Sequence, residues 1–303
     1  MALTLLQFVN RAELQLGLAQ SNAVVSSSVT QAQQMLGMAQ GALEELYSSY
    51  EWRKCVRAYY FTTTPAVSGT CNVSSATATL SGFASTSGLA AGMVITGPGI
   101  APYAEVSSVG ASDVIMTYPA TATTASASCN FCTQDYDLPS GFDRMVPDTN
   151  WDRTDYWRNI GPKSSQEWQW LQGGVISTGP RERFRIYDNK LRFFPAPTAA
   201  LNIAFEYVSN FTVIASGGTT ATKATFTVDT DTCIFRDELI VKALKYHWKQ
   251  AKGLDYGAEL AEYADALSRA KAQDEPVGIQ SLAPRFAQEL IGPWSVPDGN
   301  WPQ

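Results

Sequence analysis

The sequence has few charges and almost no histidine. Charged residues make up 17% of the 303 residues, and His247 is the single histidine. Histidine is the side chain that most often serves in acid–base catalysis at neutral pH. Because His247 lies between Tyr246 and Trp248 in the middle of a predicted helix, we expect it to be a packing or surface residue. Catalysis of the Ser/His/Asp or Cys/His type would depend on this residue, so neither is expected.

Other absences exclude further classes. The 22 Lys and Arg against 28 Asp and Glu give a net charge of −6, which disfavours tight nonspecific binding to nucleic acid. No apolar run approaches the ~18 residues of a membrane span. Residues 1–20 carry Arg11 and Glu13 and lack a basic start, so we expect a helix there and not a signal peptide, in a protein kept soluble in a cytoplasm. Neither a P-loop nor a Gly-x-Gly-x2-Gly fingerprint is present.

The five cysteines do not form the dense, even pattern of a disulfide scaffold. Cys129 and Cys132 have the Cys-x2-Cys spacing that suits zinc, and Cys71 is a third candidate ligand. No second pair and no nearby histidine completes a tetrahedral set. We therefore expect no metal and no cofactor.

Apolar residues recur at helical spacing near both ends of the chain, over residues 5–16, 32–50, 235–248 and 260–270. Ser28 and Gln31 resemble a capping box for the second of these helices. Each end supplies a hairpin with an apolar face left over. The economical solution is a discontinuous helical bundle of residues 1–52 and 232–274.

The middle of the chain reads as β-structure in two blocks. Residues 66–131 contain no Lys or Arg, and short alternating runs predict an inserted small sandwich or barrel, with strands at 77–80, 93–96 and 114–117. Gly97-Pro98-Gly99 is expected to be a turn. Residues 53–65 and 132–231 are predicted to form a central antiparallel β-domain with strands at 184–186, 191–194 and 203–208, the first two joined at Asp188-Asn189-Lys190. The expected fold class is therefore α+β.

Four arginines alternate along two of these strands. Arg181, Arg183, Arg185 and Arg192 are expected to share one sheet face, because strand side chains alternate with period two. The chain has six surplus acids, so we expect these arginines to pair with acids of an adjacent copy and not with nucleic acid.

Carboxylates near tryptophans leave two further interpretations open. Asp143, Asp148, Asp152, Asp155 and Glu167 lie close in sequence to Trp151, Trp157, Trp168 and Trp170, as in a glycosidase cleft or a sugar-binding face. Neighbouring opposite charges, as at Asp143-Arg144, Asp152-Arg153 and Glu182-Arg183, favour surface ion pairs instead.

Residues 275–303 contain five prolines, which exclude a continuous helix. The segment also carries large apolar side chains at Phe286, Leu290, Trp294 and Trp301. We interpret it as an extended arm that docks on a neighbouring subunit or another protein. A tail folded on its own domain is the alternative.

An ordered set of short motifs in the central block resembles a known family. The set comprises Leu138-Pro139-Ser140-Gly141-Phe142-Asp143-Arg144, Pro147-Asp148-Thr149-Asn150-Trp151-Asp152-Arg153, Ile160-Gly161-Pro162, Gln166-Glu167-Trp168, Gly179-Pro180-Arg181, Phe184-Arg185-Ile186, Phe194-Pro195-Ala196-Pro197, Phe205-Glu206-Tyr207-Val208-Ser209 and Gly253-Leu254-Asp255-Tyr256. It is similar to the head-to-tail adaptors of short-tailed bacteriophages, also called tail tubular protein A. Gly92 to Pro102 in the insert resembles a small β-module that decorates virion proteins.

The resemblance implies a structural virion protein and not an enzyme. It implies a ring of twelve copies that joins the portal protein to the tail nozzle protein, with tail fibres as further partners. Genomic DNA would pass through the ring without specific binding, and assembly would take place in the host cytoplasm. Phe286, Leu290, Trp294, Trp301, Arg181, Arg183 and Arg185 are then the expected interface residues. The alternative function is a carbohydrate-binding virion module.

Overall fold

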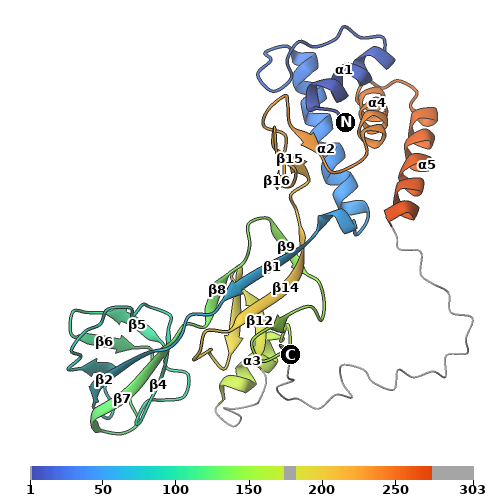
Figure 1. Cartoon of the computed structure of the whole chain (residues 1–303). Helices are drawn as coiled ribbons and strands as arrows, with labels where there is room; N and C mark the ends of the chain where they lie inside the picture. Colours follow the sequence, from blue (N-terminus) through green and yellow to red (C-terminus); the bar gives the residue numbers. More distant parts are fainter. Residues whose placement is uncertain (1, 174–181, 275–303) are drawn as a thin grey trace, which may run out of the picture. The chain divides into compact units, whose positions relative to one another are not determined.

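The computed structural model describes residues 2–173 and 182–274 (Figure 1). Within these ranges the chain forms five α-helices and several antiparallel sheets, so the expected α+β class is confirmed. The described residues fall into two compact units. The helical unit comprises residues 2–57, 140–144 and 207–274, and the β-rich unit comprises residues 58–139, 145–173 and 182–206.

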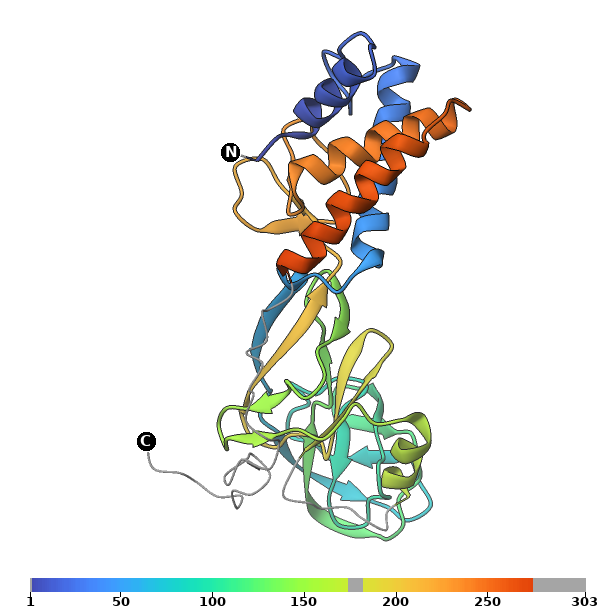
Figure 2. The same ribbon diagram turned by 90° about the vertical axis from the view of Figure 1, so that its right-hand side faces the viewer.

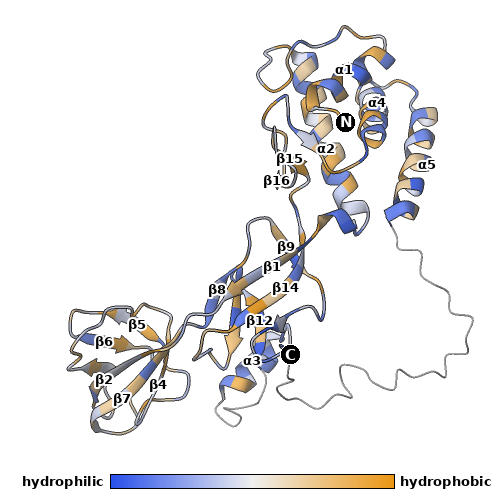
Figure 3. Ribbon diagram, in the orientation of Figure 1, coloured by the Kyte–Doolittle hydropathy of each residue, from blue (hydrophilic) through white to orange (hydrophobic). Residues whose placement is uncertain are grey.

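Four helices dominate the helical unit, and all four were predicted: α1 (Leu5–Gln15), α2 (Thr30–Ser49), α4 (Asp237–Ala251) and α5 (Gly257–Asp274). Helix α4 contacts α1, α2 and α5 (Figure 2). Each helix carries both hydrophobic and hydrophilic residues (Figure 3). The predicted stripe of α5 is wrong at Leu260, which is 41% exposed, whereas Tyr263, Ala266 and Ala270 form the buried face.

The predicted capping box at Ser28 and Gln31 is wrong. Helix α2 begins after Val29, which makes no side-chain cap, and the Gln31 amide donates instead to Glu13 at 2.9 Å. Glu13 is fully buried on α1 and also accepts hydrogen bonds from the Ser21 backbone N–H and hydroxyl at 2.8 and 2.7 Å. A buried carboxylate is costly unless it is hydrogen-bonded. The Gln31 side chain therefore bonds Glu13 and the Ala19 carbonyl and does not cap the start of α2.

Hydrogen bonds to two aspartates connect the N-terminal residues to the segment before α4. The Asp229 carboxylate accepts from the backbone N–H groups of Val24 and Val25 at 3.1 and 2.7 Å. The N–H of Leu5 donates to the Asp231 carbonyl at 2.8 Å. The same region forms a small sheet in the order β16 (Ala221–Lys223), β15 (Val213–Ile214) and β17 (Thr232–Cys233).

Two further sheets are built from strands that precede and follow helix α3 (Ser165–Gln172) along the chain. One has the order β1 (Val56–Thr62), β14 (Asn202–Ser209), β10 (Trp151–Asp152) and β11 (Trp157–Arg158), with β9 (Phe142–Met145) also paired to β14. The other has the order β12 (Arg183–Tyr187), β13 (Lys190–Phe194) and β8 (Asp135–Asp137). The predicted strands at 184–186, 191–194 and 203–208 are confirmed.

The inserted module contains six strands: β2 (Val67–Val73), β3 (Thr79–Ser81), β4 (Val94–Thr96), β5 (Val106–Val109), β6 (Asp113–Met116) and β7 (Thr124–Cys132). They pair in the order β4-β7-β2-β3-β6-β5. The Ile95 N–H donates to the Ala104 carbonyl and the Val106 N–H to the Met93 carbonyl, both at 2.8 Å, so the two ends of this order are joined. The three predicted strands and the turn at Gly97-Pro98-Gly99 are confirmed.

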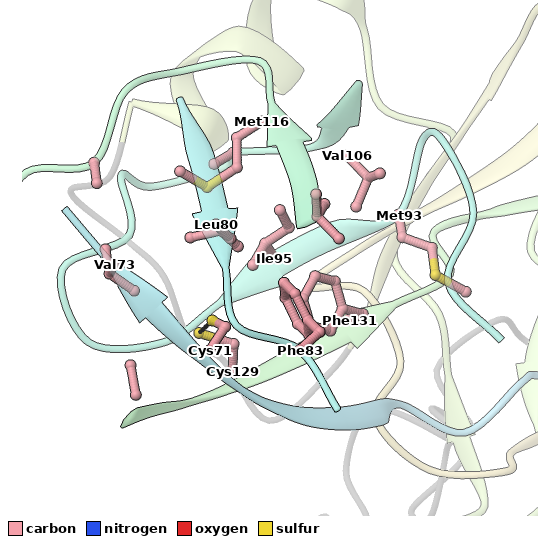
Figure 4. Close-up of a cluster of buried hydrophobic side chains, with 14 residues drawn as sticks. Cys71, Val73, Leu80, Phe83, Met93, Ile95, Val106, Met116, Cys129 and Phe131 are labelled. Atoms are coloured by element: carbon pink, nitrogen blue, oxygen red, sulfur yellow. Dashed lines mark hydrogen bonds between the residues drawn. The ribbon is translucent and has the colours of Figure 1, made fainter. Parts of the chain in front are cut away.

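The inner faces of these strands bury one hydrophobic cluster (Figure 4). Its largest side chains are Phe83 and Phe131, whose ring centroids lie 5.8 Å apart. Gly69 lies beside them, and a Cβ at this position would approach Phe83 within 3.3 Å. Alternate strand positions and loop residues such as Phe83, Ala104 and Ala120 together supply the core of this Thr- and Ser-rich insert.

Replacement of Asp231 is expected to destabilise the helical unit. Burial opposes ionisation of Asp231, but hydrogen bonds from the Thr227 and Val228 N–H groups and the Lys223 ammonium outweigh it and hold the pKa of Asp231 below its ordinary value. A lowered pKa in the folded state gives stability that is present above the unfolded pKa and lost as the pH falls through the folded value. Asp231→Ala should cost about 3 kcal/mol at pH 7 and flatten the loss of stability in acid.

Urea unfolding followed by circular dichroism between pH 2 and pH 7 measures this effect. Glu51→Ala is the matched control, because Glu51 forms a 2.9 Å ion pair with Arg144 but its side chain is 83% exposed. This control should change the free energy of unfolding by less than about 1 kcal/mol. Equal effects of the two variants would contradict the role given to Asp231.

Candidate interaction surface

The described members of the predicted arginine face share one side of a β-hairpin. Strands β12 and β13 pair with Arg185 opposite Arg192, and Arg183 lies two residues before Arg185. Because side chains alternate along a strand, these three arginines face the same side, as predicted. Arg181, the fourth predicted member, lies outside the described residues, as do Phe286, Leu290, Trp294 and Trp301.

The hairpin turns within two residues. Tyr187 pairs with Lys190, and the intervening Asp188 and Asn189 have φ angles of 49° and 56°. Two positive φ angles define the turn type that matches the twist of paired strands, and Asn and Asp tolerate it. The predicted turn is confirmed, although Lys190 belongs to β13. The hairpin is thus a well-defined projection of the β-rich unit.

Arg192 and Arg185, which face each other across the hairpin, both have partners within the chain. Arg192 Nε and Nη2 each donate to the Asp135 carboxylate at 2.6 Å, and these bonds raise the pKa of Arg192. The Arg185 guanidinium lies 4.7 Å from the ring centre of Trp168 and 4.5 Å from that of Tyr187. Burial, and next Arg192, lower the pKa of Arg185, which is only 9% exposed. The Arg185 guanidinium thus has aromatic partners within its own chain, and a role at an interface remains a prediction for it and for Arg183.

Trp168 anchors this face from α3. The helix starts with a capping box in which Ser164 and Glu167 bond each other's backbone N–H groups. Trp168 is fully buried and packs with Leu171 and Phe194, so α3, a helix that the sequence analysis did not predict, has an apolar side. The next tryptophan along the helix, Trp170, is 57% exposed. One helix therefore supplies both a core anchor and a surface aromatic.

Three large apolar side chains of this region are exposed. Tyr187 is 54% exposed and Ile186 37% at the end of the hairpin, and Trp170 lies on α3. Aromatic residues that lose water on binding contribute much of the energy of protein interfaces. Ile186 points to the opposite face of the hairpin from Tyr187, because neighbouring strand residues alternate. Trp170 and Tyr187, which we call the exposed apolar set, are suited to contact another protein. The sequence analysis did not separate them from buried aromatics, because their exposure depends on how α3 and β12 pack.

A polar cavity of about 610 Å³ lies within the same unit. Loop residues of the inserted module and residues of α3 line it, among them Tyr103, Tyr118, Gln169 and Gln172. Glu105, also in the lining, accepts a hydrogen bond from Gln134 at 2.7 Å. The volume is that of a small-molecule site.

Only part of the predicted carboxylate cluster stays together, because Asp152 and Asp155 interact whereas the other three acids have separate partners. Asp143 pairs with Arg144 at 3.5 Å, as predicted, whereas the predicted pairs Asp152–Arg153 and Glu182–Arg183 are not among the ion pairs of the described residues. Asp148 pairs instead with Arg158 at 2.8 Å and Glu167 with Lys163 at 3.2 Å. Asp152 is buried and accepts from the Thr154 N–H at 2.7 Å. The tryptophans do not gather either, because Trp151 and Trp157 occupy non-facing positions on paired strands and Trp168 is in the core.

Sequence analysis missed an acidic group around Glu182. Burial raises the pKa of Glu182 to about 8, and Asp152 and Asp155 add to the shift. Burial also raises the pKa of Asp152. A parallel bridge between Ile160 and Arg183 draws these sequence-distant residues together. No linear sequence motif predicts such a group. Carboxyl groups with shifted pKa values also occur at functional sites.

Of the three candidate zinc ligands, only Cys71 and Cys129 lie together, with their Sγ atoms 3.4 Å apart. Alternation along β7 places Cys129 in the core of the module, and Cys132 three positions later points to the other face. Among the described residues, no group of three or more His, Cys, Asp and Glu side chains is arranged to hold a metal ion. His247 Nε2 lies 3.1 Å from Glu45, and burial lowers the pKa of His247. Among the same residues, no helix is both long and apolar enough to cross a bilayer.

A family comparison identifies the class of protein. The model of the SU10 adaptor protein family matches residues 113–285, which is more than half of the chain. The chain belongs to the SU10 adaptor protein family. The adaptor is thus a structural phage protein and a virion component, and its family is not an enzyme family. No curated protein matches it.

The matched segment of the adaptor begins at β6 and includes α3, the arginine face, α4 and α5. Most strands of the inserted module lie before it. An adaptor family implies assembly with phage portal and tail components in general. The exposed apolar set therefore lies in the part of the chain that the family shares.

Glu182→Gln is expected to stabilise the adaptor at alkaline pH. A carboxyl whose pKa is raised on folding loses stability as the pH rises from the unfolded value of about 4.3 toward the folded value. With a folded pKa of about 8, Glu182 should lower the free energy of unfolding over that window. The amide carries no charge, so the variant should gain about 1–2 kcal/mol at pH 8 and little at pH 4.

Thermal unfolding at pH 4, 6 and 8 checks this expectation. Glu206→Gln serves as control, because Glu206 is exposed. If the unfolding temperatures of Glu182→Gln and of the unmodified adaptor change equally with pH, burial does not raise the pKa of Glu182.

Proposed function

We propose that the protein is a head-to-tail adaptor that forms a ring of twelve copies between the portal protein and the tail nozzle protein. The observation that carries the proposal is the family match over residues 113–285. The ordered motifs that resemble tail tubular protein A lie largely within this segment. Negative-stain imaging of the purified protein, alone and mixed with portal, tests it, because a ring that caps the portal is the expected result.

We also propose a domain arrangement for this ring. Residues 1–52 and 232–274 form a discontinuous helical bundle, residues 53–65 and 132–231 a central β-domain, and residues 66–131 an inserted barrel. The contacts of α4 with α1, α2 and α5 support the bundle. The hydrogen bonds that join residues 93–95 to residues 104–106 support a closed barrel. Such a module would sit at the outside of the ring, where tail fibres attach.

The acidic balance suits a channel for DNA. A net charge of −6 leaves few cations to condense phosphates, so a lumen lined by carboxylates would let DNA slide without specific binding. A ring whose lumen is basic and retains DNA at physiological salt would contradict this part of the proposal.

The exposed apolar set is proposed to contact a neighbouring subunit or a tail component. Trp170→Ala and Tyr187→Ala should raise the concentration for half-assembly about tenfold or more, because exposed aromatics at interfaces are frequent energetic centres. Trp170 is 57% exposed, so Trp170→Ala should leave the stability of the monomer unchanged. Tyr187→Ala also removes the ring that the Arg185 and Arg192 guanidinium groups contact, so its free energy of unfolding is measured beside its assembly. Mass photometry over a dilution series measures assembly.

Tyr118→Ala is the matched control for these variants. Tyr118 is 55% exposed but belongs to the inserted module, which the proposal places outside the ring contacts. Assembly that is unaffected by the Trp170 and Tyr187 variants, or equally weakened by the Tyr118 variant, would remove the exposed apolar set from the interface.

The C-terminal arm, residues 275–303, is proposed to dock on the portal or on the adjacent subunit through Phe286, Leu290, Trp294 and Trp301. Its deletion should abolish attachment to portal-bearing heads and leave the circular dichroism spectrum of the remaining chain unchanged. Loss of the ring would indicate docking on a neighbouring subunit, and a ring that no longer binds portal would indicate docking on the portal. Unimpaired attachment would refute the arm's role.

The alternative function is a carbohydrate-binding virion module, and the cavity of about 610 Å³ is the observation that favours it. Its tyrosine, glutamine and glutamate lining offers the aromatic faces and hydrogen-bonding groups that sugars require. Glycan-array binding by the purified chain, lost in Gln169→Ala, would support this function.

A further inference from the structure

Two cysteine side chains meet in the core of the inserted module. The Sγ atoms of Cys71 and Cys129 lie 3.4 Å apart (Figure 4). Cys71 is 1% exposed and Cys129 is fully buried. They belong to the neighbouring antiparallel strands β2 and β7, where Gly69 faces Cys129 and Cys71 faces Ala127. The two sulfurs are therefore diagonal neighbours on the inner face of one strand pair.

We propose that Cys71 and Cys129 form a latent disulfide that a small oxidant closes across β2 and β7. A disulfide needs an S–S distance of about 2.05 Å, so the sulfurs must approach by little more than one ångström. A register shift between Cys71 and Val73 interrupts regular pairing beside the site, and such irregularities let a strand adjust locally. On the other side, Gly97 leaves room for Cys129, because a Cβ there would lie 2.7 Å from its Sγ.

The pairing is specific to these two cysteines. Cys132 lies on the same strand as Cys129 but on its opposite face. Cys55 and Cys233 belong to the helical unit. All five cysteines are free and buried, so burial alone does not distinguish the pair, whereas the short sulfur–sulfur distance does.

The two cysteines lie on the first and last strands of the module, so a bond between them would affect its stability. Strand β2 leads the chain into the module and β7 leads it out, so a bond between them would tie the two ends of the insert. It would close a loop that contains residues 72–128 and would restrict the unfolded module, which stabilises the folded one. The module would then stay folded under conditions that open the rest of the chain.

The oxidant class is a small hydroperoxide. One cysteine sulfur attacks a peroxide oxygen, the O–O bond breaks, and hydroxide leaves, so that this sulfur becomes a sulfenic acid. The second sulfur attacks the sulfenic sulfur, the S–S bond forms, and the S–O bond breaks with loss of a second hydroxide. The two thiol protons convert the two hydroxides into water. The sulfurs lose two electrons, and the peroxide gains them.

Burial makes this reaction slow in the closed module. It raises the pKa of Cys71 to about 12 and also raises the pKa of Cys129, and the thiolate is the reactive form. Reaction should therefore accelerate when the module opens transiently in mild urea. The bond does not depend on which partners the protein assembles with.

The test treats the full-length protein with hydrogen peroxide in 0 to 2 M urea. The expected product has lost about 2 Da, is restored by a thiol reductant, and gives a non-reduced peptide map that links Cys71 to Cys129. Its thermal midpoint should rise by several degrees. Cys132→Ser is the matched control and should form the same link, whereas Cys71→Ser and Cys129→Ser should not.

Other outcomes would overturn the proposal. They are a gain of oxygen without any link, a link between Cys129 and Cys132, or a loss of about 2 Da that persists in Cys71→Ser. Circular dichroism verifies that the serine variants fold. If a variant fails to fold, the peptide map of the unmodified protein decides by itself.

Discussion

Helix α4 carries apolar side chains on several sides, and the helical unit depends on burying all of them against other helices. Seven of its residues are buried, and it contacts α1, α2 and α5. Neither end of the chain can supply these contacts alone, so residues near the N-terminus must meet residues beyond position 237. Asp229 and Asp231 fix that meeting through hydrogen bonds to Val24, Val25 and the start of α1. The β-structure is consequently inserted between two halves that have to meet.

The few charged residues of the β-rich unit include an arginine that pairs with acids of its own chain. Arg192 is held by Asp135 on the neighbouring strand and lies 3.9 Å from Glu105 of the inserted module. Glu105 is one of only two acids in residues 66–131, and its carboxylate also receives a hydrogen bond from Gln134. Partly buried charges with fixed partners define geometry better than exposed ones, because their alternatives are costly. The Arg192–Glu105 ion pair joins the charge-poor module to the rest of its unit, together with the packing of Tyr103 against Phe194, whose ring centroids lie 5.1 Å apart.

Periodicity predicted the elements well because it reports burial directly. The four terminal helices, the strands of the hairpin, three of the module's six strands and the turn at Asp188-Asn189 follow from local pattern, whereas β2, β5, β7 and α3 were not predicted. Local pattern failed at Ser28-Gln31, because Gln31 is used by the buried Glu13. The real capping box, Thr4-x2-Gln7, has the same kind of signature and was passed over. Sequence could not show that Trp168 is a core residue and Trp170 a surface one, since this requires the packing partners of α3.

The acidic group at Glu182 shows why a perturbed carboxyl need not indicate catalysis. Acid–base chemistry requires the titrating group to reach a bound substrate. The lining of the 610 Å³ cavity comes from residues 101–103, 105, 117–119, 169, 172 and 173 and includes neither Glu182 nor Asp152. The raised pKa of Glu182 arises from burial and from neighbouring acids, with its Oε2 atom lacking a hydrogen-bond partner among the described residues. The raised pKa of Glu182 is therefore explained by burial and by its acidic neighbours, without a role in catalysis.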